Sequence, residues 1–221
     1  MRLLASWSRQ LMCVLLYASI LLTGCKPAVK APVAEVSLLE DGHAASWKQA
    51  GIPEEGLVYV KDGLLTLAAG RPMTGATFPA WQAPDFPVTD YALSYEALRV
   101  DGDDFFGTVT FPVGSHEAYA SFVLGGWGGT VTGISSIDFA DANENATRAE
   151  MRFEKGRWYR VRIEVRPDDL RAWVDGRLMV NVSIKGRKVG LRPGFIDHCV
   201  PFGFSTYGST AQVRKVVVER L

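Results

Sequence analysis

Strict alternation of apolar and polar side chains in one short run constrains the fold of this chain more than any other feature. The run covers residues 157–165 (RWYRVRIEV). One face has the apolar residues Tyr159, Val161, Ile163 and Val165, and the other has Trp158 with the charged residues Arg160, Arg162 and Glu164. Successive side chains of a β-strand point to opposite faces, so one face packs on a core and the other meets water. The run therefore predicts a half-buried strand of an antiparallel sheet.

Similar runs follow one another along most of the chain. They are rich in β-branched and aromatic residues and are separated by Gly, Pro, Asp and Asn: GLLTLAAG, YALSYEALRV, FFGTVTFPV, AYASFVLGG, GTVTGISSID, LRAWVDGRLMVNVSI and QVRKVVVERL. Asp175-Gly176 tolerates the positive φ of a two-residue turn, which predicts a hairpin there. We expect an all-β fold, a two-sheet sandwich or jelly roll over residues 36–221, with Trp158 or Trp173 at least partly buried.

The N-terminal segment has the pattern of an export signal. Arg2 and Arg9 precede an apolar run that is too short for a transmembrane helix, which needs about 20 residues. The run ends in Leu22-Thr23-Gly24-Cys25, which resembles the lipobox of bacterial lipoproteins, in which the signal is cut before a cysteine that is then acylated. We expect a signal peptide over 1–24, and the alternative is an ordinary secretory signal cleaved near Ala18.

Acylation of Cys25, with palmitate among the chains, would anchor the protein to a membrane. Residues 25–35 are proline- and alanine-rich and predict a flexible tether between the lipid and the domain. Lys26 stands where an inner-membrane retention Asp is expected in enterobacteria, which favours the outer membrane or cell envelope of a Gram-negative-type bacterium.

The charge balance gives no electrostatic basis for binding nucleic acid. The chain has 24 basic and 24 acidic residues, and loss of Arg2 and Arg9 with the signal would leave 22 basic residues. With Cys13 removed and Cys25 acylated, Cys199 has no disulfide partner, and we expect it to be a small buried core residue.

Four blocks in this order carry a family resemblance: GGWGGTVTGISSID with ANEN, FEKGRWYRVRIEVRPDDLRAWVDG, KGRKVGLRP, and VRKVVVERL. They resemble bacterial exported proteins of the 3-keto-disaccharide hydrolase domain family, over nearly the whole of the mature domain. The resemblance implies a concanavalin A-like, laminin-G-like jelly roll that faces a sugar, and an activity on oxidised disaccharides.

An acidic cluster follows the GGWGG block. If residues 130–139 form one strand, Thr130, Thr132, Ser136 and Asp138 share its polar face, and Val131, Ile137 and Phe139 share the other. Turn-forming residues follow, so Asp141 and Glu144 are expected on a loop beyond the strand. Three interpretations stay open: a catalytic carboxylate pair, a ligand or metal site, or a loop whose Asp138, Asp141 and Asn145 hydrogen-bond their own backbone.

The segment SIDFAD also resembles the Glu-x-Asp-x-x-Glu strand of laminarinase-type glycosidases on the same fold. Ser136 takes the nucleophile position, which argues against double displacement, while Asp138 and Asp141 take the middle and acid/base positions.

The family name implies different chemistry, in which a base removes the proton beside a sugar ketone and a cation or metal stabilises the enolate. Candidate bases are Glu96, His116, Asp138 and Glu144, although the segment GSHEAY around His116 also predicts a solvent-facing hairpin turn.

Two further sets of residues are candidates for binding. Asp101, Asp103 and Asp104 alternate around Gly102 and offer oxygen ligands to calcium, or else form a solvated turn. Trp127 lies among four glycines, and Trp81 lies in a proline-rich crossing segment. Either indole would stack on a sugar if it is exposed at the rim of the sheet.

Three functions follow from these patterns. The first is a membrane-anchored glycoside hydrolase acting on 3-keto disaccharides. The second is a non-catalytic carbohydrate-binding module, and the third is an interaction lipoprotein that uses no pocket. Carboxylates converging with a cation would favour the first, and an aromatic surface without paired acids would favour the second.

Overall fold

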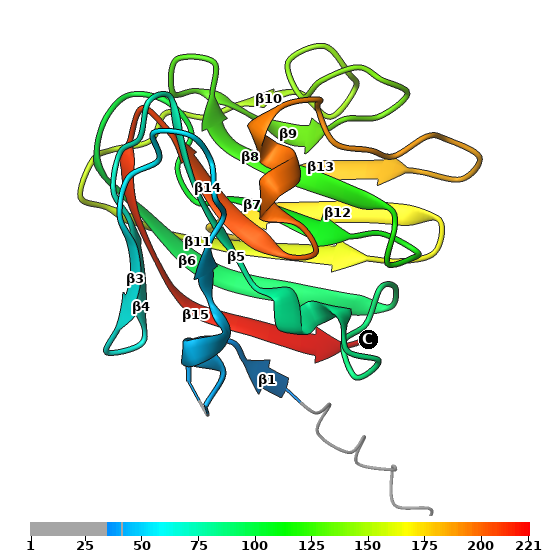
Figure 1. Cartoon of the computed structure of the whole chain (residues 1–221). Helices are drawn as coiled ribbons and strands as arrows, with labels where there is room; N and C mark the ends of the chain where they lie inside the picture. Colours follow the sequence, from blue (N-terminus) through cyan, green and yellow to red (C-terminus); the bar gives the residue numbers. More distant parts are fainter. Residues whose placement is uncertain (1–34, 41) are drawn as a thin grey trace, which may run out of the picture. The chain divides into compact units, whose positions relative to one another are not determined.

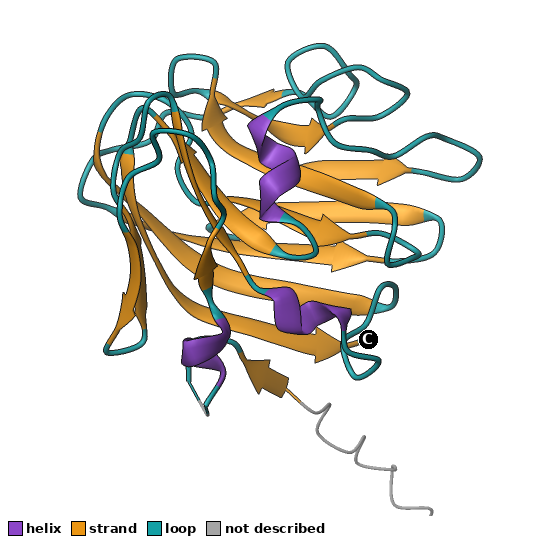
Figure 2. Ribbon diagram, viewed as in Figure 1, coloured by secondary structure: helices purple, strands orange, loops and turns teal. Residues whose placement is uncertain are grey.

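Two antiparallel β-sheets form the fold in the computed structural model, which describes residues 35–40 and 42–221 (Figures 1 and 2). Sheet A has the strand order β13 (Arg177–Ser183), β12 (Asp169–Val174), β11 (Trp158–Val165), β6 (Tyr91–Asp101), β15 (Thr210–Arg220), β4 (Leu64–Leu67) and β3 (Val58–Lys61), and β1 (Glu35–Ser37) also pairs with β15. Sheet B has the order β10 (Ala149–Glu150), β9 (Val131–Ser135), β8 (Tyr119–Gly126), β7 (Thr108–Pro112), β14 (Gly203–Tyr207), β5 (Met73–Thr77) and β2 (Lys48–Gln49).

Helix is confined to three short 3₁₀ turns in the described residues: η1 (His43–Ser46), η2 (Pro79–Gln82) and η3 (Phe195–Cys199). The predicted all-β jelly roll is therefore confirmed. The described part of the chain contains no helix long and apolar enough to span a membrane. The predicted signal peptide over 1–24, the acylated Cys25 and the tether up to residue 34 lie outside the described residues.

The predicted alternation along β11 places Tyr159, Val161, Ile163 and Val165 in the core. Its outward neighbour Trp158 is half-buried, as is Trp173 on β12. The predicted hairpin is also present, because β12 ends at Val174 and β13 begins at Arg177. Asp175 and Gly176 between them have positive φ of 49° and 80°.

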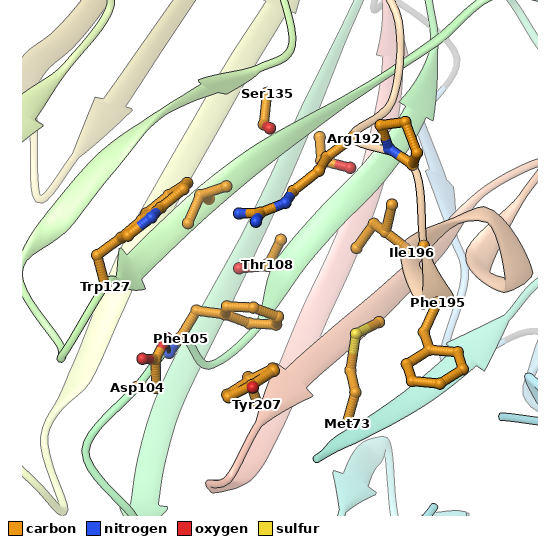
Figure 3. Close-up of a pocket in the computed structure, with 14 residues that line it drawn as sticks. Met73, Asp104, Phe105, Thr108, Trp127, Ser135, Arg192, Phe195, Ile196 and Tyr207 are labelled. Atoms are coloured by element: carbon orange, nitrogen blue, oxygen red, sulfur yellow. Dashed lines mark hydrogen bonds between the residues drawn. The ribbon is translucent and has the colours of Figure 1, made fainter. Parts of the chain in front are cut away.

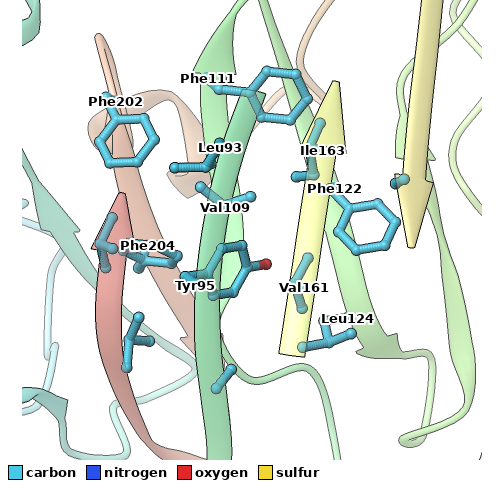
Figure 4. Close-up of a cluster of buried hydrophobic side chains, with 14 of the residues drawn as sticks. Leu93, Tyr95, Val109, Phe111, Phe122, Leu124, Val161, Ile163, Phe202 and Phe204 are labelled. Carbon is cyan, nitrogen blue, oxygen red and sulfur yellow. The ribbon is translucent and has the colours of Figure 1, made fainter. Parts of the chain in front are cut away.

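The hydrophobic core lies between the two sheets (Figure 4). Sheet A contributes side chains such as Leu93, Tyr95 and Ile163, and sheet B contributes aromatic residues such as Phe111, Phe122 and Phe204. The polar end of Tyr95 is satisfied within this apolar layer, since its hydroxyl donates to the carbonyl of Gly107 at 3.0 Å. These aromatic rings bury large apolar surfaces and contribute much of the stability of the sandwich.

The outer face of sheet B differs from the core face because small hydroxyl side chains cover it. Ser121 on β8 pairs in register with Thr110 on β7 and with Ser135 on β9, so all three side chains share this face. They are buried, at 4% exposure or less, although they lie outside the core. This shows that other segments of the chain cover part of the sheet.

Two covering segments can be identified. A Cβ added at Gly75 on β5 would meet the Cys199 sulfur of η3 at 2.8 Å, and one at Gly133 on β9 would meet the Thr147 carbonyl oxygen at 3.0 Å. Figure 1 shows η3, in orange, in front of the strands of sheet B. The glycines therefore let η3 and the loop after β9 lie directly on the sheet.

The prediction of one strand over residues 130–139 was wrong in length and in phase. β9 ends at Ser135, and Asp138 and Phe139 both have positive φ, in a tight turn closed by the bridge between Ile137 and Ala140. Because Ile134 lies in the core and Ser135 lines the outer face, even-numbered residues of β9 point inward, the reverse of the prediction. Phe139, expected on the apolar face, is 80% exposed.

The prediction that Trp81 lies at a sugar-binding rim was also wrong. Its side chain is fully buried and stacks on Phe202, with ring centroids 4.4 Å apart. The 3₁₀ turn η2 directs the indole inward, and its N–H donates to the carbonyl of Pro87 at 3.0 Å. Both its apolar surface and its one polar group are thus used by the core.

Candidate functional site

A pocket of about 380 Å³ opens on the outer face of sheet B, beside the covering segment that contains η3 (Figure 3). Its floor comes from β5, β7, β8, β9 and β14, and its walls come from the turn after β8, the loop before β7 and residues 192–196. The lining residues are Met73, Asp104, Phe105, Thr108, Ser121, Val123, Trp127, Ser135, Arg192, Pro193, Gly194, Phe195, Ile196 and Tyr207.

Trp127 forms one wall and is held at the tip of a glycine-rich turn. Its φ is 49°, and Gly128 and Gly129 on its C-terminal side have φ of 82° and 100°. The Asp104 carboxylate fixes this turn to the loop before β7, because its Oδ2 accepts the N–H of Gly128 at 2.9 Å and its Oδ1 accepts the N–H of Phe105 at 2.7 Å. The turn presents an indole that remains 38% exposed.

A buried arginine supports this wall from behind. The Arg99 guanidinium donates to the carbonyls of Asp104 at 3.2 Å and Phe153 at 2.8 Å, and lies 5.0 Å from the centroid of the Phe106 ring. Burial lowers the pKa of Arg99. The two carbonyls and the aromatic face stabilise its charge inside the protein, and they tie the Asp104 loop to the adjacent edge of the domain.

The pocket has a polar half and an apolar half, and Arg192 forms one side of the polar half. Its Nη1 lies 3.3 Å from Oδ2 of Asp141, and its Cζ lies 5.8 Å from the centroid of the Trp127 ring. The other oxygen of Asp141 accepts the Ser135 hydroxyl at 3.0 Å. Ser135, Asp141, Arg192 and Trp127 therefore form a continuous chain of contacts along one side of the pocket.

The other half of the pocket is apolar. Phe105 and Tyr207 lie with ring centroids 5.7 Å apart, and Figure 3 shows them with Met73 and Phe195 on the side away from Arg192 and Ser135. Tyr207 and Phe195 are 43% and 39% exposed, so their rings are available to a ligand.

The structure brings three of the predicted site residues to this pocket. Trp127 and Asp104 line it, and Asp141 contacts it through Ser135 and Arg192. Asp104, however, had been predicted as a calcium ligand, and here its carboxylate accepts two backbone amides.

Asp138 and Glu144 lie on the neighbouring loop and do not line the pocket. The Asp138 carboxylate accepts the N–H of Lys188 and the Nε–H of Arg187, both at 2.9 Å. These two hydrogen bonds, that from the Lys188 backbone first, lower the pKa of Asp138. Glu144 is exposed, and its N–H donates to the Asp141 carbonyl at 2.9 Å. The Asp138 carboxylate thus hydrogen-bonds residues 187–188 and not its own loop. Of the three residues in the self-bonding alternative, Asn145 fits it, because its Nδ2–H donates to the carbonyls of Ile134 and Ala140 at 2.8 and 2.9 Å.

The remaining candidate bases lie elsewhere. Glu96, on the outer face of sheet A, pairs with Arg214 at 2.7 Å and Lys215 at 2.9 Å. Burial raises the pKa of Glu96, but the hydrogen bonds from Lys215 and Arg214 outweigh burial, and the net pKa is lowered. His116 lies in the predicted turn between β7 and β8, but it is half-buried and not solvent-facing, and its backbone carbonyl accepts the Tyr119 hydroxyl.

Asp101 and Asp103 both face Lys155, with oxygen–nitrogen distances of 3.1 and 3.3 Å. The structure thus does not bring the three aspartates around one cation. Among the described residues, no group of three or more His, Cys, Asp or Glu side chains is arranged to hold a metal ion.

Sequence reasoning missed most of the pocket, including Ser135, Arg192 and three aromatic residues, Phe105, Phe195 and Tyr207. Arg192 lies in the block KGRKVGLRP, which contributed to the family resemblance without being assigned a role. The three aromatic residues come from distant segments, and no local spacing connects them.

Similar solved structures share the jelly roll at low sequence identity. The carbohydrate-binding module CBM66 from Bacillus subtilis is 14% identical, with a TM-score of 0.50 over 79% of this chain and 95% of that one. The Crh5 transglycosylase in complex with NAG is 10% identical, with a TM-score of 0.54 over 86% of this chain and 84% of that one. A β-1,3-1,4-glucanase (lichenase) derived from a mouse hindgut metagenome is 10% identical, with a TM-score of 0.53 over 85% and 98%. These similarities establish the fold.

Among curated proteins, none matches the sequence of this chain. One family model matches residues 35–219, which span every strand described except the last residue of β15. Its description is the 3-keto-alpha-glucoside-1,2-lyase-like domain, in agreement with the resemblance that the sequence blocks indicated. This chain belongs to the family of 3-keto-alpha-glucoside-1,2-lyase-like domains.

Proposed function

We propose that this domain binds carbohydrate in the pocket on the outer face of sheet B. The observation that carries the proposal is the exposed Trp127 indole, held rigidly beside the Arg192 guanidinium. The apolar face of a pyranose ring packs on an indole, while donors at its edge bind the hydroxyl groups. The pocket volume of about 380 Å³ falls within the usual range of about 300–1,000 Å³ for small-molecule sites.

Polar groups of the right kind lie around the indole. Arg192 supplies only donors, Asp104 supplies acceptors, and Ser121 and Ser135 supply hydroxyls from the floor. Because the Asp104 carboxylate already accepts two amides and Asp141 already pairs with Arg192, these groups are fixed before a ligand arrives. A preorganised site loses less conformational entropy on binding.

A second candidate function is cleavage of 3-keto-glucosides, which the family membership and Arg192 favour. In this reaction a base removes the proton at C2 and the electron pair forms an enolate on the C3 oxygen. The C1–oxygen bond then breaks as the C1–C2 double bond forms, and the aglycone oxygen takes the proton back from the protonated base as it leaves. Water adds to the resulting double bond to complete hydrolysis. In this proposal Arg192 would stabilise the enolate, and Asp141, which pairs with it at 3.3 Å, is the candidate base beside it.

Binding is tested by titration calorimetry of glucosides and 3-keto-glucosides into the wild type and Trp127→Ala. The expected result is measurable affinity in the wild type that falls at least about tenfold in Trp127→Ala, since stacking and cation–π contacts are lost. Phe139→Ala is the matched control, because Phe139 is an exposed aromatic side chain that does not line the pocket. Equal affinity in Trp127→Ala and Phe139→Ala would place the sugar elsewhere.

Cleavage is tested separately by following exchange of the C2 proton of a 3-keto-glucoside in heavy water by NMR. Elimination requires this proton to leave, so the wild type should exchange it, and Arg192→Gln should slow exchange while the Trp127 contact with the sugar remains. Binding without exchange and without released aglycone would show that the pocket binds sugar and performs no elimination.

We also propose that the chain is an exported lipoprotein anchored through Cys25. The lipobox-like Leu22-Thr23-Gly24-Cys25 and the short apolar run before it support this proposal.

A further inference from the structure

The pocket is divided into a polar half and an apolar half, and this division has consequences for its ligand. Arg192 and Ser135 lie at one side, whereas Phe105, Tyr207 and Phe195 lie at the other (Figure 3). Trp127 stands between them at the wall that also holds Asp104.

The apolar half offers almost no hydrogen-bonding side chains. Its apolar side chains are Met73, Phe105, Phe195 and Tyr207, and among these four the Tyr207 hydroxyl is the one strong hydrogen-bonding group. Asp104, beside Phe105, already accepts two backbone amides. A second sugar ring placed here would bring several hydroxyls out of water and leave most of them without a partner. Such unpaired groups are unfavourable, so this half selects against a second pyranose.

The same residues are well suited to a flat aromatic group. Phe105 and Tyr207 meet at an interplanar angle of 46°, with centroids 5.7 Å apart, which leaves ring edges and faces available to a third ring. Met73 adds a polarizable thioether of the type that contacts aromatic rings favourably, and it is backed by Ile52 and Cys199. Burial of the Cys199 thiol raises its pKa to about 12, so it is an inert apolar neighbour.

We propose that the ligand is a glucoside whose aglycone is aromatic, with the sugar on Trp127 and Arg192 and the aglycone against Phe105, Tyr207 and Phe195. This inference rests on the proposed sugar site and specifies which class of glycoside that site takes. It differs from the disaccharide that the family resemblance implied.

The test is titration calorimetry of the full chain with three ligands that share the sugar: methyl glucoside, phenyl glucoside and a glucose disaccharide, each in native and 3-keto form. We expect phenyl glucoside to bind about tenfold more tightly than either of the others, as aromatic contacts of this kind provide. Phe195→Ala and Tyr207→Ala should each reduce this preference, measured as the ratio of the two affinities, because each variant should weaken phenyl glucoside more than methyl glucoside. Both side chains are partly exposed, at 39% and 43%, and lie outside the hydrophobic core, so the variants should fold.

Tyr59→Ala is the matched control, since Tyr59 is 49% exposed and lies on β3 of sheet A, away from the pocket. A disaccharide that binds as tightly as phenyl glucoside, or a preference that survives in both pocket variants, would overturn the aglycone assignment and leave the sugar site standing. If no glucoside binds, or if the loss in Trp127→Ala equals that in Tyr59→Ala, the sugar site itself fails and the aglycone assignment fails with it.

Discussion

Replacing Trp81 with alanine distinguishes a core tryptophan from a ligand-binding one. The Trp81 side chain is fully buried, stacks on Phe202 at 4.4 Å and on Phe86 at 5.1 Å, and donates its N–H to the carbonyl of Pro87. The Trp81 ring also contacts Tyr91 at 5.7 Å, so the substitution removes a large apolar group, three ring contacts and one buried hydrogen bond.

The expected cost follows from these contacts. A tryptophan side chain buries about 150–250 Å², which at about 25 cal/mol per Å² is an upper value of about 4–6 kcal/mol. Truncations of buried Trp typically cost about 3–5 kcal/mol, and the unpaired Pro87 carbonyl adds about 1 kcal/mol. We expect the free energy of unfolding to fall by about 4 kcal/mol, or Tm by about 8–16 °C for a domain of this size.

Urea denaturation followed by fluorescence gives the free energy of unfolding of the wild type, Trp81→Ala and Trp127→Ala. Trp127→Ala should change it by less than about 1 kcal/mol, because surface substitutions have small effects. Sugar affinity, measured on the folded fraction, should be lowered in Trp127→Ala and unchanged in Trp81→Ala. A loss below about 1 kcal/mol in Trp81→Ala would refute the burial argument, since no buried Trp of this kind is so easily removed.

Three further predictions concern single residues. Asp138→Asn should lower Tm and leave sugar affinity unchanged, because the amide oxygen can accept the Lys188 N–H but the ion pair with Arg187 is lost. Melting curves and calorimetry check this, and unchanged Tm with lost affinity would contradict it. The folded pKa of Glu96 is lowered, so its stabilisation is complete above the unfolded pKa and is lost as the pH falls through the folded one. The free energy of unfolding of Glu96→Gln should therefore fall less steeply below about pH 5 than that of the wild type, and equal slopes would argue against it. Cys25→Ser should prevent acylation, and mass spectrometry that finds an unmodified Cys25 in membrane-bound wild type would remove the lipoprotein hypothesis.

The fold could be predicted because its signal is local. Alternation along β11 and the Asp175-Gly176 turn each depend on residues that are adjacent in sequence, and both are confirmed. At β9 the side chains also alternate, but the prediction of which face meets the core was wrong. Val131, Gly133 and Ser135 face outward, while Thr132 and Ile134 face the core. The hydroxyls of this strand do not mark the water-exposed side, because the outer face is itself covered and partly polar.

The candidate site could be predicted only in part, for a related reason. Trp127 stood out because glycines surround it and no neighbouring side chain could cover it. Its partner Arg192 comes from a distant segment, just before η3, that lies on the outer face of sheet B, so no spacing in the sequence relates the two. The prediction that Trp81 lies at the rim was wrong because a proline-rich segment usually crosses the surface, whereas η2 turns its indole inward.

The position of the last strands sets the order in which this domain can form. β15 lies between β6 and β4 and pairs Glu219 with Glu35, and β14 lies between β7 and β5. The centres of both sheets thus come from residues 203–220, so a nascent chain cannot complete either sheet until that segment has been synthesised. Such long-range pairing makes folding slow, on the order of milliseconds to seconds. A polypeptide interrupted before Gly203 would leave β4, β5, β6 and β7 with unpaired edges, and we expect it to aggregate rather than to form half a sandwich.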